Sequence, residues 1–320
     1  MSPIINGRVI FNSYPKGFPE PGKTLIYDKS SNIDLDNTPL DGGVLVKTLE
    51  LSIDPYLRHL MEEAPTGYKL GEPTHGGGVA VVLRSESENV QVASWILKNP
   101  YKLPWSAFTG VLGMPGLSAY QGWRDFSNAK KGEVAFVTSG AGPVGSLVIQ
   151  LAKFDGLKVI ASAGSEDKVQ LMKDLGADVV FNYKRTNTSD VPKKEGPIDV
   201  YWDNVGGEVL DDALVNANTF ARFIECGMIS GYNDNHACGL KNIWQVVVRQ
   251  ISIHGFLVSD KYLVNHEFYK FMEPKIAKGE IKYVEDCFEG LENVGEAISG
   301  LQRGLVKAKV VVHVDDVDEA

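Results

Sequence analysis

The sequence predicts an α/β protein in which a doubly wound parallel sheet is joined to a second, strand-rich part. Three observations lead to this expectation. Short β-rich runs, separated by Pro, Gly, Asn and Asp, fill the first part of the chain. From about Glu133, apolar runs of strand length alternate with helix-like segments, which is typical of βαβ units. The length of 320 residues fits roughly two domains.

The strand-rich part suits a small barrel or an antiparallel sheet, because its apolar runs are short and the residues between them favour turns. Its expected strands cover residues 9–11, 25–27, 43–46 and 78–82. Another strand is expected near the C-terminus, at residues 309–314. This last strand either closes the parallel sheet or returns to the strand-rich part.

In the middle of the chain, expected strands alternate with expected helices, as in βαβ units. Strands are expected at residues 133–138, 158–161, 178–181, 199–202 and 221–224. Helices are expected at residues 144–154 and 167–175, and another is expected after Gly207. Strands that alternate with helices in this way form a parallel sheet covered on both faces.

The composition is that of a globular chain, with 43% hydrophobic and 23% charged residues, and it excludes a disordered or collagen-like protein. A net charge of −9 without a basic stripe disfavours binding to nucleic acid or to an anionic membrane surface. The chain contains no run of about 18 apolar residues and no signal-peptide core at its N-terminus. We therefore expect neither a membrane span nor a nucleic-acid partner.

Three cysteines, Cys226, Cys238 and Cys287, are too few for a disulfide framework. Their odd number and sparse placement favour a reducing compartment, most simply the cytoplasm. The cysteines form no CxxC pair, and the six histidines form no HExxH motif. We expect no metal site.

The most informative segment is a glycine-rich turn, Gly140-x-Gly142-x-x-Gly145, which follows an expected strand and opens an expected helix. That context is the one in which such glycines bind the pyrophosphate of a dinucleotide. Glycines allow the tight turn and the close approach of the phosphates, and the helix N-terminus offers unpaired N–H groups. The alternative is a plain glycine-rich turn without a ligand.

The end of the next strand indicates which nicotinamide cofactor binds. NAD enzymes usually place Asp or Glu there, whereas this chain has the Ser-Ala-Gly-Ser stretch 162–165. Lys168 follows in the expected helix, where its charge can neutralise a 2′-phosphate. We therefore favour NADP(H), although Lys168 alone could equally be a solvated helix lysine.

Five further motifs are spread over almost the whole chain. They are Leu-Ser-Ile-Asp-Pro-Tyr-Leu-Arg at 51–58, Gly-Met-Pro-Gly-Leu-Ser-Ala-Tyr at 113–120, Phe-Asn-Tyr-Lys at 181–184, Asp-Asn-Val-Gly-Gly at 203–207 and Cys-Gly-Met-Ile-Ser-x-Tyr-Asn at 226–233. Together these motifs resemble those of the zinc-independent medium-chain dehydrogenase/reductase family. The nearest group in that family is formed by prostaglandin reductases, plant double-bond reductases and fungal alkenal or enone reductases.

The resemblance implies a fold and a reaction. A GroES-like barrel domain would come from residues 1–116 and 283–320, and a Rossmann NADP-binding domain would come from residues 117–282. The family's reaction would be the NADPH-dependent reduction of the carbon–carbon double bond of an α,β-unsaturated aldehyde or ketone. Hydride would reach the β-carbon, and the enolate would then take a proton at the α-carbon. A homodimer is expected by analogy with relatives.

The resemblance also implies roles for individual residues. Tyr232, beside the nicotinamide ribose, and Tyr56, lining the substrate pocket, would be the catalytic side chains. A hydroxyl donor can stabilise the charge that develops on the carbonyl oxygen, although both residues could instead be core tyrosines. The cofactor-binding positions, from the pyrophosphate to the adenosine and then the nicotinamide end, would be Gly142, Pro143, Val144, Gly145, Gly164, Lys168, Tyr183, Asn204, Tyr232, Met114 and Ser118.

The chain departs from the family pattern at one place. Residues 92–97 run almost directly into the Pro-Tyr-Lys-Leu-Pro stretch 100–104, where relatives have further barrel strands. The barrel domain is therefore expected to be incomplete, with unpaired strand edges and exposed apolar surface. Two alternatives to an enone reductase stay open: a quinone reductase on the same fold, and an NADPH-binding protein that has lost its activity through this deletion.

Overall fold

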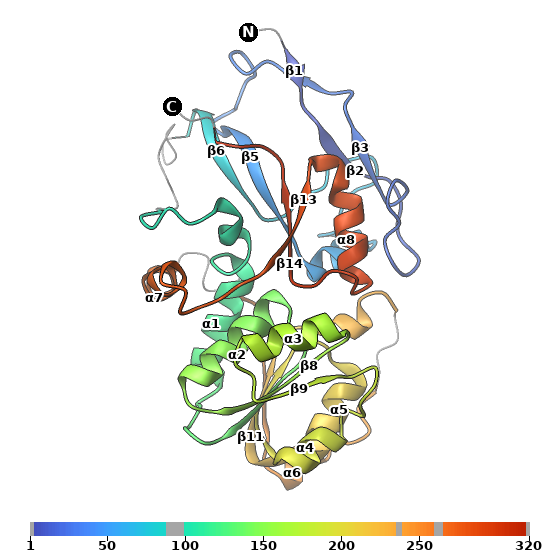
Figure 1. Cartoon of the computed structure of the whole chain (residues 1–320). Helices are drawn as coiled ribbons and strands as arrows, with labels where there is room; N and C mark the ends of the chain where they lie inside the picture. The colour runs from blue at the N-terminus through green and yellow to red at the C-terminus, as the bar shows by residue number, and fades with distance from the viewer. Residues whose placement is uncertain (1–2, 88–98, 235–238, 259–264, 318–320) are drawn as a thin grey trace. The chain divides into compact units, whose positions relative to one another are not determined.

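The computed structural model describes residues 3–87, 99–234, 239–258 and 265–317, and Figure 1 shows their helices and strands. The chain divides into two compact units. Unit 1 comprises Met1–Thr109, Glu285–Val306 and Val310–Ala320, and unit 2 comprises Gly110–Val284 and Lys307–Lys309. The boundaries expected from the sequence, at residues 116 and 283, lie near these, and the roles assigned to the two domains stay predictions.

Unit 2 contains a six-stranded, fully parallel sheet in the order β12-β11-β10-β7-β8-β9. This is the strand order of a doubly wound Rossmann sheet, so the predicted fold class is confirmed. The order reverses between β7 and β10, which makes this the topological switch point. The strands are β7 (Val134–Val137), β8 (Lys158–Ala163), β9 (Val179–Asn182), β10 (Ile198–Asp203), β11 (Ala217–Glu225) and β12 (Ser252–Gly255).

Helices cover both faces of this sheet, with α2 and α3 on one side and α4 and α5 on the other (Figure 1). The inner strands are largely apolar because helices cover both of their faces: Ala135, Phe136 and Val137 of β7 are completely buried. The helices are α1 (Met114–Phe126), α2 (Pro143–Phe154), α3 (Glu166–Asp174), α4 (Asp190–Glu195), α5 (Gly207–Val215), α6 (Gln245–Val248), α7 (His266–Ala277) and the 3-10 helix η3 (Ile229–Gly231).

Unit 1 contains a four-stranded sheet in the order β13-β14-β5-β6, together with two strand pairs, β2–β3 and β1–β4. The last strand, β14, pairs antiparallel with β5, so the C-terminal strand returns to the strand-rich part and does not close the parallel sheet. The elements are β1 (Ile4–Ile5), β2 (Arg8–Phe11), β3 (Leu25–Asp28), β4 (Asn32–Ile33), β5 (Val44–Ile53), β6 (Gly78–Ser85), β13 (Glu285–Glu289), β14 (Lys309–His313), α8 (Val294–Gln302) and the 3-10 helices η1 (Pro55–Met61), η2 (Trp105–Thr109) and η5 (Leu291–Asn293).

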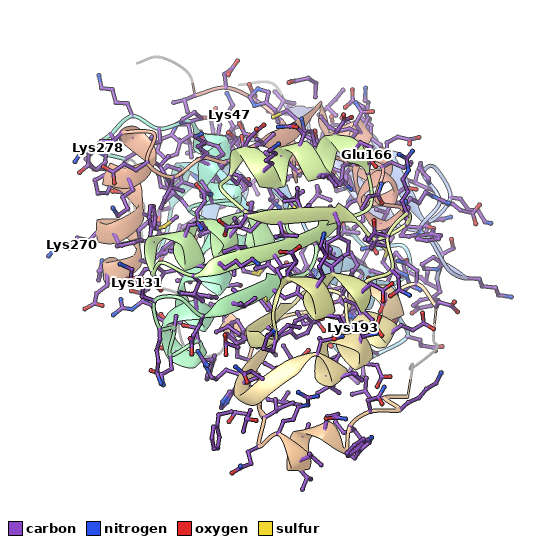
Figure 2. The ribbon with its side chains drawn as sticks, turned by 60° about the horizontal axis from the view of Figure 1, so that its bottom comes forward. Lys47, Lys131, Glu166, Lys193, Lys270 and Lys278 are labelled. Atoms are coloured by element: carbon purple, nitrogen blue, oxygen red, sulfur yellow. The ribbon has the colours of Figure 1, made fainter. Side chains whose placement is uncertain are left out.

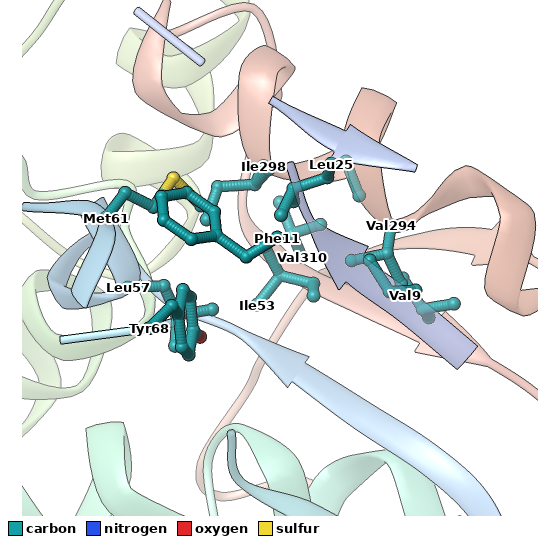
Figure 3. Close-up of a cluster of buried hydrophobic side chains, with 12 residues drawn as sticks. Val9, Phe11, Leu25, Ile53, Leu57, Met61, Tyr68, Val294, Ile298 and Val310 are labelled. Atoms are coloured by element: carbon teal, nitrogen blue, oxygen red, sulfur yellow. The ribbon is translucent and has the colours of Figure 1, made fainter. Parts of the chain in front are cut away.

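The core of unit 1 joins segments from both ends of the chain (Figure 3). Phe11 of β2 is completely buried and packs in one cluster with Met61 of η1 and Ile298 of α8. Val310 of β14 completes this cluster from the far end of the sequence. Burial of these apolar side chains therefore holds the C-terminal segment on the N-terminal strands.

The expected deletion falls on residues that the structure does not describe, because residues 88–98 lie outside the described ranges. Within the described part, β6 is an edge strand of the four-stranded sheet. Exposed apolar side chains lie on this side of the sheet, at Val44, Val46 and Leu83. In the described ranges, no helix has the length and apolar character that crossing a membrane requires.

Candidate active site

The glycine-rich turn joins the end of β7 to α2 at the switch point of the unit 2 sheet. A Cβ atom on Gly145 would stand 2.5 Å from the Ser139 carbonyl oxygen and 2.9 Å from the Cα of Gly140, so only glycine lets α2 start this close to the turn. Gly142 is the N-cap, and no side chain of the described residues caps α2. Its first N–H groups and the positive end of its dipole therefore suit a pyrophosphate.

Pro143 and Val144 form the first turn of α2. Proline at this position sets the backbone for a helix and removes an N–H group that has no partner within the helix. The predicted pyrophosphate positions, 142–145, thus share one turn at the carboxyl end of β7. Parallel sheets bind ligands at this edge, beside the switch point. These residues fit a dinucleotide, and their contacts to it stay predictions.

The predicted adenosine residues gather at the carboxyl ends of β8 and β9. A Cβ atom on Gly164 would stand 2.8 Å from the Tyr183 hydroxyl oxygen and 3.1 Å from Cζ of the same ring. The Tyr183 N–H group donates to the Ala163 carbonyl at 3.1 Å, which aligns the two chain segments. The ring itself is 48% exposed, and Lys168 lies half-buried in the first turn of α3. Gly164 and Tyr183 are thus direct neighbours.

Asn204, predicted at the nicotinamide end, follows β10 directly across the switch point from β7. Its backbone N–H donates to the Thr138 hydroxyl at 2.8 Å, and its side-chain Nδ2 donates to the Thr138 carbonyl at 2.7 Å. Trp202 Nε1 donates to Asn204 Oδ1 at 3.3 Å. The amide of Asn204 therefore fastens the ends of β7 and β10 together.

Sequence reasoning missed Thr138 and Asp203 as organisers of this edge. Asp203 Oδ1 accepts hydrogen bonds from the Thr138 hydroxyl at 3.0 Å, from the Val205 N–H at 2.8 Å and from the Gly206 N–H at 3.0 Å. Thr138 ends one expected strand and Asp203 directly follows another, so each places a polar side chain at the sheet edge that binds ligands. That position was the available signal.

A second carboxyl group lies beside Asp203, because Glu225 at the end of β11 is its register neighbour. Burial raises the pKa of Glu225 to about 8, and the charge of Asp203 adds to the shift. Burial likewise raises the pKa of Asp203. Two buried acids side by side do not both ionise easily, so one of them stays protonated near neutral pH.

Cys226 directly follows Glu225 at the same edge of the unit 2 sheet. Burial raises the pKa of its thiol to about 12, and the neighbouring acids Asp203 and Glu225 act in the same direction. The thiol is therefore protonated at neutral pH and is a poor nucleophile.

Tyr232, predicted to be catalytic, follows η3 in the loop after β11. Its hydroxyl accepts a hydrogen bond from the Met228 N–H at 3.3 Å and lies 3.2 Å from the place of a Cβ atom on Gly227. Burial raises the pKa of this phenol. At neutral pH the side chain is therefore a protonated hydroxyl that can donate a hydrogen bond.

Met114 and Ser118 lie in the first two turns of α1. Met114 is 40% exposed, whereas Ser118 is buried and donates its hydroxyl to the Met114 carbonyl at 2.8 Å. The hydroxyl of Ser118 is thus engaged within its own helix. A contact between Ser118 and the cofactor stays a prediction.

Tyr56, the other predicted catalytic residue, belongs to η1 of unit 1. Its half-buried ring packs against the core cluster of Figure 3. Burial raises the pKa of its hydroxyl, and the charge of Asp54 contributes. The structure therefore supports a core role for Tyr56, and its contact with substrate stays a prediction. Within the described ranges, no group of three or more His, Cys, Asp or Glu side chains is arranged to hold a metal ion.

Comparisons with known proteins cover both units. Residues 143–277 match a family model described as a zinc-binding dehydrogenase, and residues 8–106 match one described as the N-terminal domain of oxidoreductase. The chain is 37% identical to the NADP(+)-dependent 2-alkenal reductase of Nicotiana tabacum, over 97% of this chain and 98% of the relative. It is 35% identical to the (+)-pulegone reductase of Mentha piperita, over 97% and 99%.

The crystal structure of CurA from Vibrio vulnificus, solved in complex with NADPH, is similar to this structure with a TM-score of 0.85. It is 31% identical in sequence and covers 98% of this chain and 100% of CurA. The alignment with the tobacco relative extends over 338 positions, more than the 320 residues of this chain. The relative therefore contains residues that have no counterpart here.

Proposed function

Because the chain belongs to the zinc-independent medium-chain dehydrogenase/reductase family, we propose that it is an NADPH-dependent ene-reductase of α,β-unsaturated ketones and aldehydes. The observation that carries the proposal is the full-length similarity to the tobacco 2-alkenal reductase and the peppermint pulegone reductase. The similarity to CurA, which binds NADPH, and the glycine turn at the switch point support the cofactor.

Unit 2 would hold the cofactor through the sites described above. Positions 142–145 would bind the pyrophosphate, and Gly164, Lys168 and Tyr183 would surround the adenosine ribose and its 2′-phosphate. Asn204, Met114 and Ser118 would lie toward the nicotinamide. When bound, NADPH supplies the hydride that the reduction requires.

The chain's own contribution to the chemistry is a protonated hydroxyl. Negative charge develops on the carbonyl oxygen of an enone as its double bond is reduced, and a positioned donor stabilises that charge. Tyr232 fits this role because its raised pKa keeps the phenol protonated. Tyr56 is our second candidate for contact with substrate, and its pKa is also raised.

One assay separates the proposal from its alternatives. NADPH oxidation is followed with an enone, with a quinone, and with an aldehyde that lacks a conjugated double bond. Oxidation with the enone alone is the expected result. Oxidation with the quinone alone would instead identify a quinone reductase. Measurable NADPH binding without oxidation of any of the three would mean that the barrel-side deletion has removed the activity.

We further propose that the protein is a cytoplasmic homodimer. An open sheet edge supports the dimer, because β12 is the last strand of the unit 2 sheet and carries the exposed Ile253. The neighbouring α6 segment exposes Trp244, Val247 and Val248. Light scattering of the purified protein should give twice the monomer mass, and Ile253→Lys should reduce it. The free thiols of Cys226 and Cys287 suit a reducing compartment, which cell fractionation can test.

A further inference from the structure

We propose that Arg185 determines the preference for NADPH by pairing with its 2′-phosphate, and that Glu166 holds Arg185 when no phosphate is present. The proposal rests on the proposed function, because it names a specificity residue in the same cofactor site. Arg185 is outside the motifs of the sequence analysis, although it stands two residues after Tyr183.

Two side chains, those of Arg185 and Asn182, contact one carboxylate oxygen of Glu166. Arg185 Nη1 lies 3.3 Å from Glu166 Oε1, and Asn182 Nδ2 donates to the same Oε1 at 2.8 Å. Figure 2 labels Glu166 at the start of α3. The Arg185 N–H donates to the Asn182 carbonyl at 3.0 Å, which fixes the turn that carries the guanidinium. Arg185 is therefore anchored at the carboxyl ends of β8 and β9.

That place is the adenosine end of the candidate site. Tyr183, two residues before Arg185, packs directly on Gly164, which immediately follows β8. Glu166 begins α3 two residues after Gly164. The ion pair between Arg185 and Glu166 thus lies beside the residues proposed to surround the ribose.

The charges of this end favour a further cation for binding a phosphate. The first turn of α3 carries two carboxylates, Glu166 and Asp167, against the one lysine, Lys168. A phosphate next to these carboxylates is repelled unless further cations offset them. Lys184 and Arg185 supply those cations from the turn after β9.

Arg185 can exchange its ion pair with Glu166 for one with a phosphate. The Arg185 and Glu166 side chains are 74% and 59% exposed, so water and salt weaken their attraction. A phosphate carries more charge than a carboxylate and accepts two parallel hydrogen bonds from a guanidinium. Arg185 can therefore move from Glu166 to the 2′-phosphate at little cost.

The test measures binding of 2′,5′-ADP and of 5′-AMP to the full chain by calorimetry, so it does not depend on turnover. Arg185→Gln should weaken binding of 2′,5′-ADP by about tenfold and leave that of 5′-AMP unchanged. Lys193→Gln is the matched control, because Lys193 also forms an exposed ion pair, with Asp190 at 3.7 Å. Figure 2 labels Lys193 apart from Glu166. The control should leave both affinities unchanged.

A second variant tests whether Glu166 holds Arg185 when no phosphate is bound. Glu166→Gln should tighten binding of 2′,5′-ADP several-fold, because it removes a repelling charge and releases Arg185. If neither Arg185→Gln nor Glu166→Gln changes the ratio of the two affinities, Arg185 is not the specificity residue. If the unaltered chain already binds 5′-AMP as tightly as 2′,5′-ADP, the NADPH assignment of the proposed function fails instead. Thermal melting of each variant confirms that these exposed substitutions leave the fold intact.

Discussion

The sheets of the two units differ in how far their faces are buried. The inner strands of unit 2 are buried on both faces, as the fully buried Ala135, Phe136 and Val137 of β7 illustrate. The β5–β6 side of unit 1 leaves Val44, Val46 and Leu83 between 38% and 43% exposed. A parallel sheet needs helices on both faces, whereas an antiparallel sheet tolerates an open face. Among the described residues, helices therefore cover the inner strands of unit 2, whereas apolar side chains on the β5–β6 side of unit 1 stay exposed.

This difference separates cofactor binding from turnover. Every contact described for the pyrophosphate and adenosine positions lies within unit 2. The shortfall relative to the tobacco protein was predicted to fall in the strand-rich part. Binding of NADPH and reduction of an enone are consequently distinct properties of this chain, and variants should affect them separately.

The largest effect is expected where α2 packs closely on the glycine-rich turn of unit 2. Gly145→Ala would place a methyl group 2.5 Å from the Ser139 carbonyl oxygen, so α2 must move away from the turn. We expect a loss of about 1–3 kcal/mol in the free energy of unfolding and at least a tenfold loss of NADPH affinity. Urea unfolding and fluorescence titration with NADPH measure the two effects.

The control for this substitution is Gly255→Ala at the end of β12, where a Cβ atom would meet no atom of the described residues within 4 Å. It should leave NADPH affinity unchanged. Equal losses in the two variants would mean that the close approach of α2 to the turn does not shape the cofactor site.

The buried acid pair predicts a pH dependence of stability that originates in unit 2. The pKa of Glu225 in the folded chain is about 8, raised from its ordinary value of 4.5. The folded state then binds more protons than the unfolded state between these values. The stabilisation is complete below about pH 4.5 and is lost as the pH rises toward about 8.

Glu225→Gln removes this titration and keeps a neutral side chain of the same size. We expect the free energy of unfolding of the variant to fall less between about pH 6 and pH 8 than that of the unaltered chain, with a difference of roughly 1–2 kcal/mol. Urea unfolding at both pH values measures it. Parallel pH profiles of the two proteins would contradict a protonated Glu225.

A smaller effect is expected at the adenosine end. Lys168→Ala should raise the Michaelis constant for NADPH by about tenfold and leave that for NADH nearly unchanged, because only NADPH carries the 2′-phosphate. Steady-state rates with each cofactor at saturating enone provide the measurement. Equal changes for NADPH and NADH would identify Lys168 as a structural residue of α3.

The sequence was informative where one local pattern decides the structure. The glycines at 140–145 between an apolar strand and an apolar helix were enough to place the turn, because only that geometry needs them. The strand at 309–314 was recognised, but its partner was not, because an apolar run fits either sheet. The four-residue strand β12, Ser252–Gly255, was missed because two of its residues are polar or titratable and no apolar run marks it.

In the candidate site, too, contacts between distant segments could not be predicted from local sequence patterns. Gly164 and Tyr183 lie side by side because they follow adjacent parallel strands, and their contact with the cofactor stays a prediction. The hydrogen bond between the Asn204 amide and Thr138 could not be predicted, because it depends on the strand order at the switch point. Arg185 could not be weighed from the sequence, because its ion pair with Glu166 joins two turns about 20 residues apart.

The smallest effect is expected on the open face of unit 1, and it tests the comparison directly. Val46→Thr, at a side chain 43% exposed, should change the free energy of unfolding by no more than about 0.5 kcal/mol, because its hydroxyl can bond to water. The same substitution at Val159, which is completely buried in β8, should cost about 1–3 kcal/mol. Urea unfolding of both variants gives the two values. If Val46→Thr costs as much as Val159→Thr, the face formed by Val44, Val46 and Leu83 is covered in solution, and unit 1 is as closed as unit 2.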